Sequence, residues 1–538
     1  MTGTLYRGGT ILTLESGQAA ALATRGERIV AVGSEAACRA ALGEGAVEEV
    51  DLDGGCLLPG FIDTHLHPIG LLYFDMHADL RGVDSIAAVQ ERLRAAAARL
   101  APGEWLVGLQ LEDADLAERR LPTREELDAA CPDRPLVVMK HDGHSACGNS
   151  AALAAAGIDA ATPDPPGGHI ERDARGAPSG ACREAAAQRL FGVVPSPSLE
   201  RLQATAQATF ERLAAHGITS IGAILQTDEE GPGGASGQLE SLAMQLLLEQ
   251  APFSIYSILI GREVDGALAA RGSALQAPAA GHRVGGYKIF ADGTFGSCTA
   301  CMREPFSDRP ASRGYLTLER DEILRRMRAA HDAGLQICVH VIGDGAVETV
   351  VELFEQLLAE RPRADHRHRL EHASLVPPAL VPRLARLGLV VSTQPLFIHS
   401  EKHWLHRRLG DARARYTYPL RSLVEGGVVV AGASDAPVES TDVLHAIQCC
   451  ITREGFEPQE ALTAAQALDL FTRAAAHAQF EEAEKGTLAA GKRADLVWLD
   501  ANPLTVPPDR IAAIRVLRTI RGGQVTFSSD LRASAPLR

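Results

Sequence analysis

The chain lacks an excess of positive charge, a long apolar segment and an ordered cysteine framework, and each absence excludes a class of protein. Its 53 basic and 68 acidic side chains give a net charge of −15, so a nucleic-acid partner is not expected, because phosphate binding depends on Lys and Arg. No run approaches the roughly 20 apolar residues of a membrane span, and the N-terminal stretch lacks the apolar core of a signal peptide. We therefore predict a cytoplasmic protein with no nucleic-acid or membrane partner.

The ten cysteines follow no spacing typical of disulfide frameworks. In a chain of 538 residues they are best explained as reduced, mostly buried thiols. Cys298 and Cys301 form a single CxxC pair, but no second pair follows at zinc-site spacing. We therefore expect neither a metal nor a redox role for these two residues.

Short apolar runs alternate with helix-like stretches along most of the chain, which is typical of a parallel α/β fold. Nine runs qualify as strands: "CLLPGFIDTH", "PLVVMKH", "GITSIGAI", "FSIYSILI", "VGGYKIFA", "LQICVH", "HRLEH", "LGLVVSTQ" and "GVVVAGASD". An eight-stranded barrel needs one fewer, and periodicity does not identify the surplus run.

The two ends of the chain differ from its middle. Residues 1–55 and 485–525 contain short alternating stretches with glycine turns, which are typical of antiparallel strands. We predict that these ends pair into one small β-domain, beside a barrel of residues 56–484 that carries loop insertions. The Pro/Gly-rich segment 162–180 is long for a connection, so we expect it to lie over an active site.

The stretch "PGFIDTHLHP" at 59–68 places His65 and His67 at the end of a predicted strand. Residues two apart on a strand project to the same side, so the two imidazoles can converge on one ion. Taken alone, the pair is equally compatible with two hydrogen-bonded histidines. Four further polar residues stand near the carboxyl ends of other predicted strands: Lys288, His340, His372 and Asp435.

In a parallel barrel these strand ends share one rim, which is where barrel enzymes build their active sites. Imidazole and carboxylate ligands indicate a divalent metal, with Zn²⁺ as first choice. Lys288 poses a difficulty, because an ammonium has no lone pair for a cation. Burial could yield a neutral amine that adds carbon dioxide, giving a carbamate with one oxygen for each of two metals. The alternative for Lys288 is an ordinary salt bridge.

Seven ordered stretches resemble the amidohydrolase superfamily, and more closely its family 3 branch, the YtcJ-like metal-dependent hydrolases: "LLPGFIDTHLHP", "DGHSACGNSAAL", "YKIFADGTFGSCTA", "VHVIGDGAV", "RLEHASLV", "YPLRSLVEGGVVVAGASDAPV" and "KGTLAAGKRADLVWLDANP". The resemblance implies a distorted (β/α)8 TIM-like barrel with a small β-sandwich domain formed by both chain ends. It also implies one or two divalent metals. His65 and His67 would bind the first with Asp435, His340 and His372 would bind the second, and Lys288 would bridge both as a carboxylated lysine.

The same resemblance implies hydrolysis of a C–N bond in an amide, N-formyl, carbamate or cyclic amide substrate by metal-activated hydroxide. Asp435 would act as general base and then as general acid. His144 is a candidate for orienting the carbonyl or stabilising the oxyanion, the alternative being a histidine that packs its loop. A metal-dependent lyase or isomerase, acting by decarboxylation or enolisation, is the alternative function. An inactive scaffold would not need the full ligand set.

Three features complete the predictions. Asp344 in "IGDG" is expected to fix the loop after His340 through backbone hydrogen bonds, or to orient a ligand. His399, His403 and His406 are spaced as on a helix, and we expect a surface or pocket-lining role for them rather than a further metal site. The expected partner is a small-molecule substrate, with a homodimer as the default assembly.

Overall fold

The computed structural model describes residues 3–101, 103–140, 145–195 and 197–529. The chain divides into two compact units, one comprising 1–70 with 207–538 and the other comprising 71–206. None of the helices in the described ranges combines the length and the apolarity that crossing a bilayer requires.

The first unit contains an eight-stranded sheet in which every neighbouring pair is parallel. Its first and last strands also meet, because the backbone N–H of Asp435 donates to the carbonyl of His65 at 2.8 Å. The predicted distorted (β/α)8 barrel is therefore confirmed. In sheet order the strands are β8 (Phe61–Leu66), β15 (Ile218–Gln226), β16 (Ser254–Ile260), β17 (His282–Phe290), β18 (Gln336–Val341), β19 (Arg369–His372), β20 (Val390–Thr393) and β21 (Val429–Gly432).

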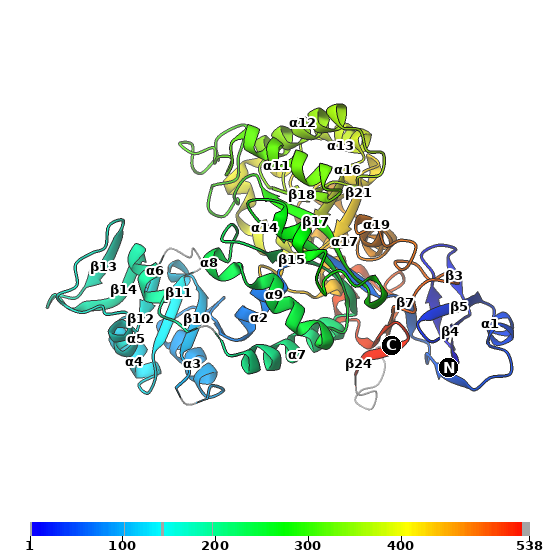
Figure 1. The fold of residues 1–538 in the computed structure, drawn as a ribbon, viewed down its shortest axis with the longest axis horizontal. Coiled ribbons are helices and arrows are strands. Elements are labelled where there is room, and N and C mark those ends of the chain that lie inside the picture. The colour runs from blue at the N-terminus through cyan, green and yellow to red at the C-terminus, as the bar shows by residue number, and fades with distance from the viewer. Residues whose placement is uncertain (1–2, 102, 141–144, 196, 530–538) are drawn as a thin grey trace. The chain divides into compact units, whose positions relative to one another are not determined.

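Most residues of the barrel strands are buried, because both faces of the sheet are covered. Every residue of β15 and β16 is buried. Outside the strands, α11 (Arg320–Asp332) and α12 (Asp344–Glu360) pack against β18 (Figure 1). The buried residues of α12 recur every three or four positions, as an amphipathic helix requires. The other main helices of this unit are α7 (Leu199–Ala215, which begins in the second unit), α9 (Glu240–Leu247), α10 (Asp265–Ala270), α13 (Val381–Leu387), α14 (Leu396–Leu409), α16 (Leu420–Glu425), α17 (Val443–Thr452), α18 (Ala464–Leu470) and α19 (Arg473–Ala478).

The surplus ninth run is "PLVVMKH", because β11 (Leu136–Lys140) belongs to a separate sheet in the second unit. That mixed sheet has the order β13 (Gly168–Arg172), β14 (Pro178–Glu184), β12 (Ser145–Gly148), β11, β10 (Leu106–Leu111) and β9 (Ala78–Asp79). With α3 (Ile86–Ala97), α4 (Arg124–Ala130), α5 (Ser150–Ala155) and α6 (Ala185–Phe191), it encloses its own buried leucine-rich core.

The strands of segment 71–206 pair with one another and form a sheet of their own. The predicted loop 162–180 contains β13 and the start of β14, which pair as an antiparallel hairpin. Its expected place over an active site stays a prediction.

The two ends of the chain contribute to one hydrophobic core. One sheet has the order β5 (Arg28–Gly33), β4 (Ala21–Arg25), β1 (Gly3–Arg7) and β6 (Val47–Asp51), and a second has the order β24 (Gln524–Ser528), β23 (Val516–Arg521), β22 (Leu496–Leu499), β7 (Cys56–Pro59), β2 (Thr10–Leu12) and β3 (Gln18–Ala19). Leu57 of β7 pairs with Trp498 of β22, so distant segments share one sheet. Tyr6 and Leu22 of the first sheet pack in the same cluster as Leu57, Trp498 and Ile520 of the second.

Candidate metal centre

Six of the predicted residues lie together at the carboxyl ends of the barrel strands. His65 is in β8, Lys288 in β17, His340 in β18 and His372 at the end of β19. His67 follows β8 directly, and Asp435 lies three residues beyond β21. Parallel strands bring these ends to one rim, so residues from distant parts of the sequence surround one point.

Asp435 joins the two histidines of the HxH pair. Its Oδ1 lies 3.2 Å from Nε2 of His65 and 3.3 Å from Nε2 of His67. The ligand-type atoms of these three residues all lie within 4.8 Å of one another. Lys288 Nζ is 3.4 Å from Nε2 of His65, so the lysine borders the same point.

His340 and His372 complete the group from the neighbouring strands. Their ring centroids are 4.5 Å apart, and that of His372 is 5.1 Å from that of His65. Nε2 of His340 lies 3.1 Å from the carbonyl oxygen of Gly293, and Nδ1 of His372 lies 2.8 Å from Oε1 of Gln394. Because these oxygens can only accept, each contacting nitrogen carries the proton, and the opposite nitrogen retains a lone pair for a metal.

A buried ion pair between Arg369 and Glu371 orients the His65 ring. Nδ1 of His65 lies 2.6 Å from Oε2 of Glu371, and Arg369 Nε lies 2.7 Å from Oε1 of the same carboxylate. All three side chains are fully buried. Sequence reasoning missed Arg369 and Glu371, although two charged residues two positions apart in the buried strand "RLEH" indicate that each needs a partner.

Two further buried carboxyl groups hold the loops of the centre, and the sequence analysis missed both. Asp63 Oδ1 accepts hydrogen bonds from the backbone N–H groups of His65 at 3.2 Å and Ser434 at 3.1 Å. Asp292 accepts from three backbone N–H groups, those of Cys301, Ile342 and Gly343, at 2.8–3.0 Å. Burial raises the pKa of Asp63 to about 6 and that of Asp292 to about 7.

Two of the site residues adopt a backbone conformation that is rare for residues with a side chain. His372 has φ 70° and Asp435 has φ 58°. Such left-handed positions cost of order 1–3 kcal/mol and concentrate at functional sites. His372 is the last residue of β19, and Asp435 lies in the loop that follows β21.

Burial determines the charge states of the site. It lowers the pKa of His67 and of His372, and with nearby Lys288 it lowers that of His340 to about 3. These imidazoles are therefore neutral, which is the form that binds metals. Burial also lowers the pKa of Lys288. For Asp435, burial acts to raise the pKa, but His65 and His67 outweigh it and hold it well below its usual range.

The residues of this group fit a divalent metal. Two imidazoles and a carboxylate offer nitrogen and oxygen donors, and two more neutral imidazoles stand beside them. His65 also has the second contact that metal-ligating histidines usually make, since its Nδ1–H faces the Glu371 carboxylate.

Asp344, Cys298 and Cys301 were also singled out in the sequence, and their contacts are different. His144 falls outside the described residues. Asp344 Oδ1 accepts from the backbone N–H of Arg303 at 3.0 Å, so it joins the start of α12 to the loop after β17. Cys298 Sγ lies 2.7 Å from Nη1 of Arg408, and Cys301 is one of the Asp292 partners.

The predicted helical spacing of His399, His403 and His406 is confirmed, because all three lie on α14. His403 is exposed at the surface. His406 is also exposed, and its Nδ1 lies 2.9 Å from Oδ1 of Asp411. His399 instead contacts Glu454, with Nδ1 2.9 Å from both carboxylate oxygens.

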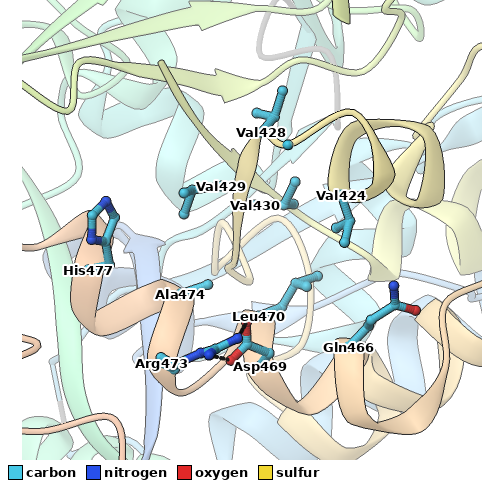
Figure 2. A pocket seen from close by; sticks show the side chains of 11 residues that line it. Val424, Val428, Val429, Val430, Gln466, Asp469, Leu470, Arg473, Ala474 and His477 are labelled. Atoms are coloured by element: carbon cyan, nitrogen blue, oxygen red, sulfur yellow. Dashed lines mark hydrogen bonds and ion pairs between the residues drawn. The ribbon is translucent and has the colours of Figure 1, made fainter. Parts of the chain in front are cut away.

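An open hollow of about 390 Å³ lies against β21, α16, α18 and α19 (Figure 2). It is lined by Val428–Val430 at the amino end of the strand and by the Asp469–Arg473 ion pair. The amino ends of barrel strands contribute to stability rather than to chemistry. None of its lining residues belongs to the metal-binding group, so the hollow is not the mouth of the centre.

A parallel eight-stranded barrel with histidines, a lysine and an aspartate at its carboxyl rim defines a metal-dependent hydrolase of the barrel type. The chain belongs to the amidohydrolase family, whose profile matches residues 48–527.

Relatives of the chain are similar over nearly its whole length. The putative amidohydrolase YtcJ of Bacillus subtilis is 29% identical over 98% of this chain and 99% of its own. The N-substituted formamide deformylase of Arthrobacter pascens is 29% identical over 95% of both chains. An uncharacterized metal-dependent hydrolase of Pyrococcus furiosus has a solved structure with a TM-score of 0.75 and 27% identity, covering 94% of this chain and 100% of that one.

Proposed function

We propose that this amidohydrolase hydrolyses a C–N bond in a small amide, N-formyl, carbamate or cyclic amide substrate. The observation that supports this most directly is Asp435 Oδ1, which lies 3.2–3.3 Å from Nε2 of both His65 and His67. A carboxylate in that place can both hold a metal and move a proton. The formamide deformylase relative, 29% identical, supports N-formyl compounds as the first substrates to test.

We infer a centre for one or two divalent metals, zinc first. His65, His67 and Asp435 would hold one metal, and His340 with His372 would hold the other. Lys288 would join them as a carbamate, formed when its neutral amine adds carbon dioxide and releases one proton. Its complete burial and its distance of 3.4 Å from His65 Nε2 support this assignment, because burial favours the neutral amine that adds carbon dioxide, and the resulting carbamate has two oxygen donors.

When bound, a divalent metal lowers the pKa of water toward neutrality and polarises a carbonyl oxygen. Asp435 would take the proton from the attacking water with the oxygen that does not face the imidazoles. It would then deliver that proton to the leaving nitrogen, which departs as an amine while the carbonyl carbon becomes a carboxylic acid. Glu371 holds the His65 ring and Gln394 holds the His372 ring, so neither ring turns during this transfer.

A substrate panel tests the proposal. The protein is loaded with Zn²⁺ and incubated with N-formyl, N-acyl, carbamate and cyclic amide compounds, and amine release is measured before and after treatment with a chelator. We expect release from at least one class, its loss on chelation, and one ¹⁸O atom in the acid when the reaction runs in H₂¹⁸O. Metal-dependent turnover without ¹⁸O would instead indicate the lyase or isomerase alternative. Absence of amine release across the panel would contradict the proposal.

A further inference from the structure

A second cluster of ligand-type side chains lies on the helices that follow the last two barrel strands. His399 of α14, His445 of α17 and Glu454 just beyond α17 place one ligand atom each within 4.8 Å of the others. Nδ1 of His399 is 2.9 Å from both oxygens of Glu454, and Nε2 of His445 is 3.4 Å from Oε1. The two rings meet edge to face with centroids 5.0 Å apart.

The backbone around Glu454 is fixed in an uncommon form. Arg453 and Glu454 have φ values of 50° and 47°, both in the left-handed region, which is costly for residues with side chains. The buried guanidinium of Arg453 donates to the carbonyls of Thr417, Tyr418 and Phe456 at 2.8–3.2 Å and holds this turn. The Glu454 carboxylate is therefore carried on a rigid segment rather than on a free loop.

The other two side chains are also held in place. Asp442 caps α17, and its side chain accepts a hydrogen bond from the backbone N–H of His445 at 3.0 Å. His399 lies in the first turn of α14, which begins three residues after β20 ends. Both histidines thus stand beyond the carboxyl ends of barrel strands, on the same rim as Asp435.

The carboxylate of the cluster is ionised at any physiological pH. Burial acts to raise the pKa of Glu454, but contacts with Lys402 and His399 outweigh it and hold that pKa at about 2. Lys402 Nζ contacts Oε2. Oε1 is the oxygen that faces His445, and Cys449 Sγ lies 3.5 Å from it.

We propose that His399, His445 and Glu454 form a second divalent-metal site, separate from the hydrolytic centre. Two imidazoles and one carboxylate are a ligand set that zinc uses with a fourth position left open. Bond lengths of 2.0–2.1 Å in a tetrahedron put donor atoms about 3.3 Å apart, and the His445–Glu454 separation of 3.4 Å is close to that value. The site shares no residue with the hydrolytic centre, and its open position would accept water or the carboxylate of a small molecule.

A metal titration tests this site without reference to activity. Full-length protein is freed of metal with a chelator and titrated with Zn²⁺ by calorimetry. Wild type is expected to bind one equivalent more than either His399→Ala or Glu454→Gln. His403→Ala is the matched control, because His403 lies exposed on the same helix outside the cluster, and it should bind as much as wild type. His399 is half exposed, so its replacement should leave the thermal melt unchanged.

Lys402→Met provides a second test, in which zinc affinity should rise rather than fall. Removing this positive charge beside the ion should tighten zinc binding at the second site by about threefold, the scale of a partly exposed charge pair. A cluster that is only hydrogen-bonded would show equal zinc stoichiometry in wild type, His399→Ala and Glu454→Gln, and that result would overturn the proposal. Weakened rather than tightened binding in Lys402→Met would also count against it.

Discussion

Nε2 of His65 lies 3.2 Å from Oδ1 of Asp435, although His65 lies in the first strand of the barrel sheet and Asp435 follows the last. The contact exists because the sheet curves until the Asp435 backbone N–H bonds to the His65 carbonyl. Closure of the barrel and assembly of the centre are therefore the same structural event. A substitution that separates β8 from the loop after β21 should therefore lower both the stability of the fold and the affinity for metal.

Replacing Asp435 with Asn should abolish hydrolysis while the protein stays folded. The amide keeps the shape of the side chain but cannot take up a proton, and general acid–base catalysis contributes roughly 10²–10⁴-fold to rate. We expect kcat to fall at least that far, as measured by amine release. Asp469→Asn, on α18 beside the hollow of Figure 2, should leave kcat unchanged. Substantial turnover in Asp435→Asn would remove its proposed role.

Glu371→Gln should weaken both the fold and the metal centre. It leaves the buried Arg369 guanidinium without a counter-charge, a loss of about 3–5 kcal/mol in buried pairs. It also weakens the hydrogen bond that orients the His65 ring through Nδ1. Loss of such a hydrogen-bond partner of a metal-binding histidine typically lowers metal affinity by about 10–100-fold. Urea unfolding and zinc titration measure the two effects separately.

A double variant distinguishes the two roles of Glu371. Arg369→Met with Glu371→Leu removes both charges, so most of the lost stability should return. Zinc affinity should stay low, because His65 still lacks its acceptor. Recovery of zinc affinity in the double variant would mean that Glu371 acts only as the partner of Arg369.

The strand-end residues could be predicted because all strands of a parallel barrel run in the same direction. A polar residue at the end of an apolar run is therefore expected at the carboxyl rim. The surplus ninth strand could not be recognised, since β11 and the barrel strands share the same apolar character. Its membership in a separate sheet depends on pairing with β10 and β12, which no local pattern encodes.

The contacts that support the centre were beyond sequence reasoning for a similar reason. Asp292 bonds to the N–H group of residue 301, farther along its own loop, and to those of residues 342 and 343 in the loop after β18. The second cluster could not be predicted either, because His399 and Glu454 are 55 positions apart in the sequence and no motif surrounds His445. Among these contacts, only the Arg369–Glu371 pair could have been inferred from the sequence, because two charged residues lie two positions apart in a buried strand.

Glu401 should make stability fall as pH rises through the neutral range. Tyr418 Oη donates to Oε2 of Glu401 at 2.5 Å, and burial raises the pKa of this carboxyl from 4.5 to about 8. Between those values the folded chain keeps a proton that the unfolded chain releases. Stability is then lost with rising pH by up to about 1.4 kcal/mol per pH unit. Glu401→Gln removes this loss, so its melting temperature should gain on wild type as pH goes from 5 to 8.

Glu355→Gln is the control for that pH series. Arg383, whose Nη2 lies 2.6 Å from Glu355 Oε2, lowers the pKa of this carboxyl. The carboxylate is therefore ionised in both folded and unfolded chains above pH 5, and its stabilising effect is lost only at lower pH. The melting temperature of Glu355→Gln should differ from wild type by a constant amount from pH 5 to 8. A constant offset for Glu401→Gln as well would contradict the raised pKa.

Asp292→Asn should loosen the loop beside His340. The carboxyl accepts from three backbone N–H groups, and an amide that retains one oxygen leaves at least one of them without an acceptor. Each unsatisfied buried group costs about 1–3 kcal/mol, and the His340 ring loses part of the frame that fixes the Gly293 carbonyl beside it. We expect lower stability in urea together with weaker zinc binding. Asp344→Asn is the matched control, because the amide keeps an oxygen that can accept from the backbone N–H of Arg303. Equal losses in the two variants would show that Asp292 merely stabilises the loop and does not position the metal ligand.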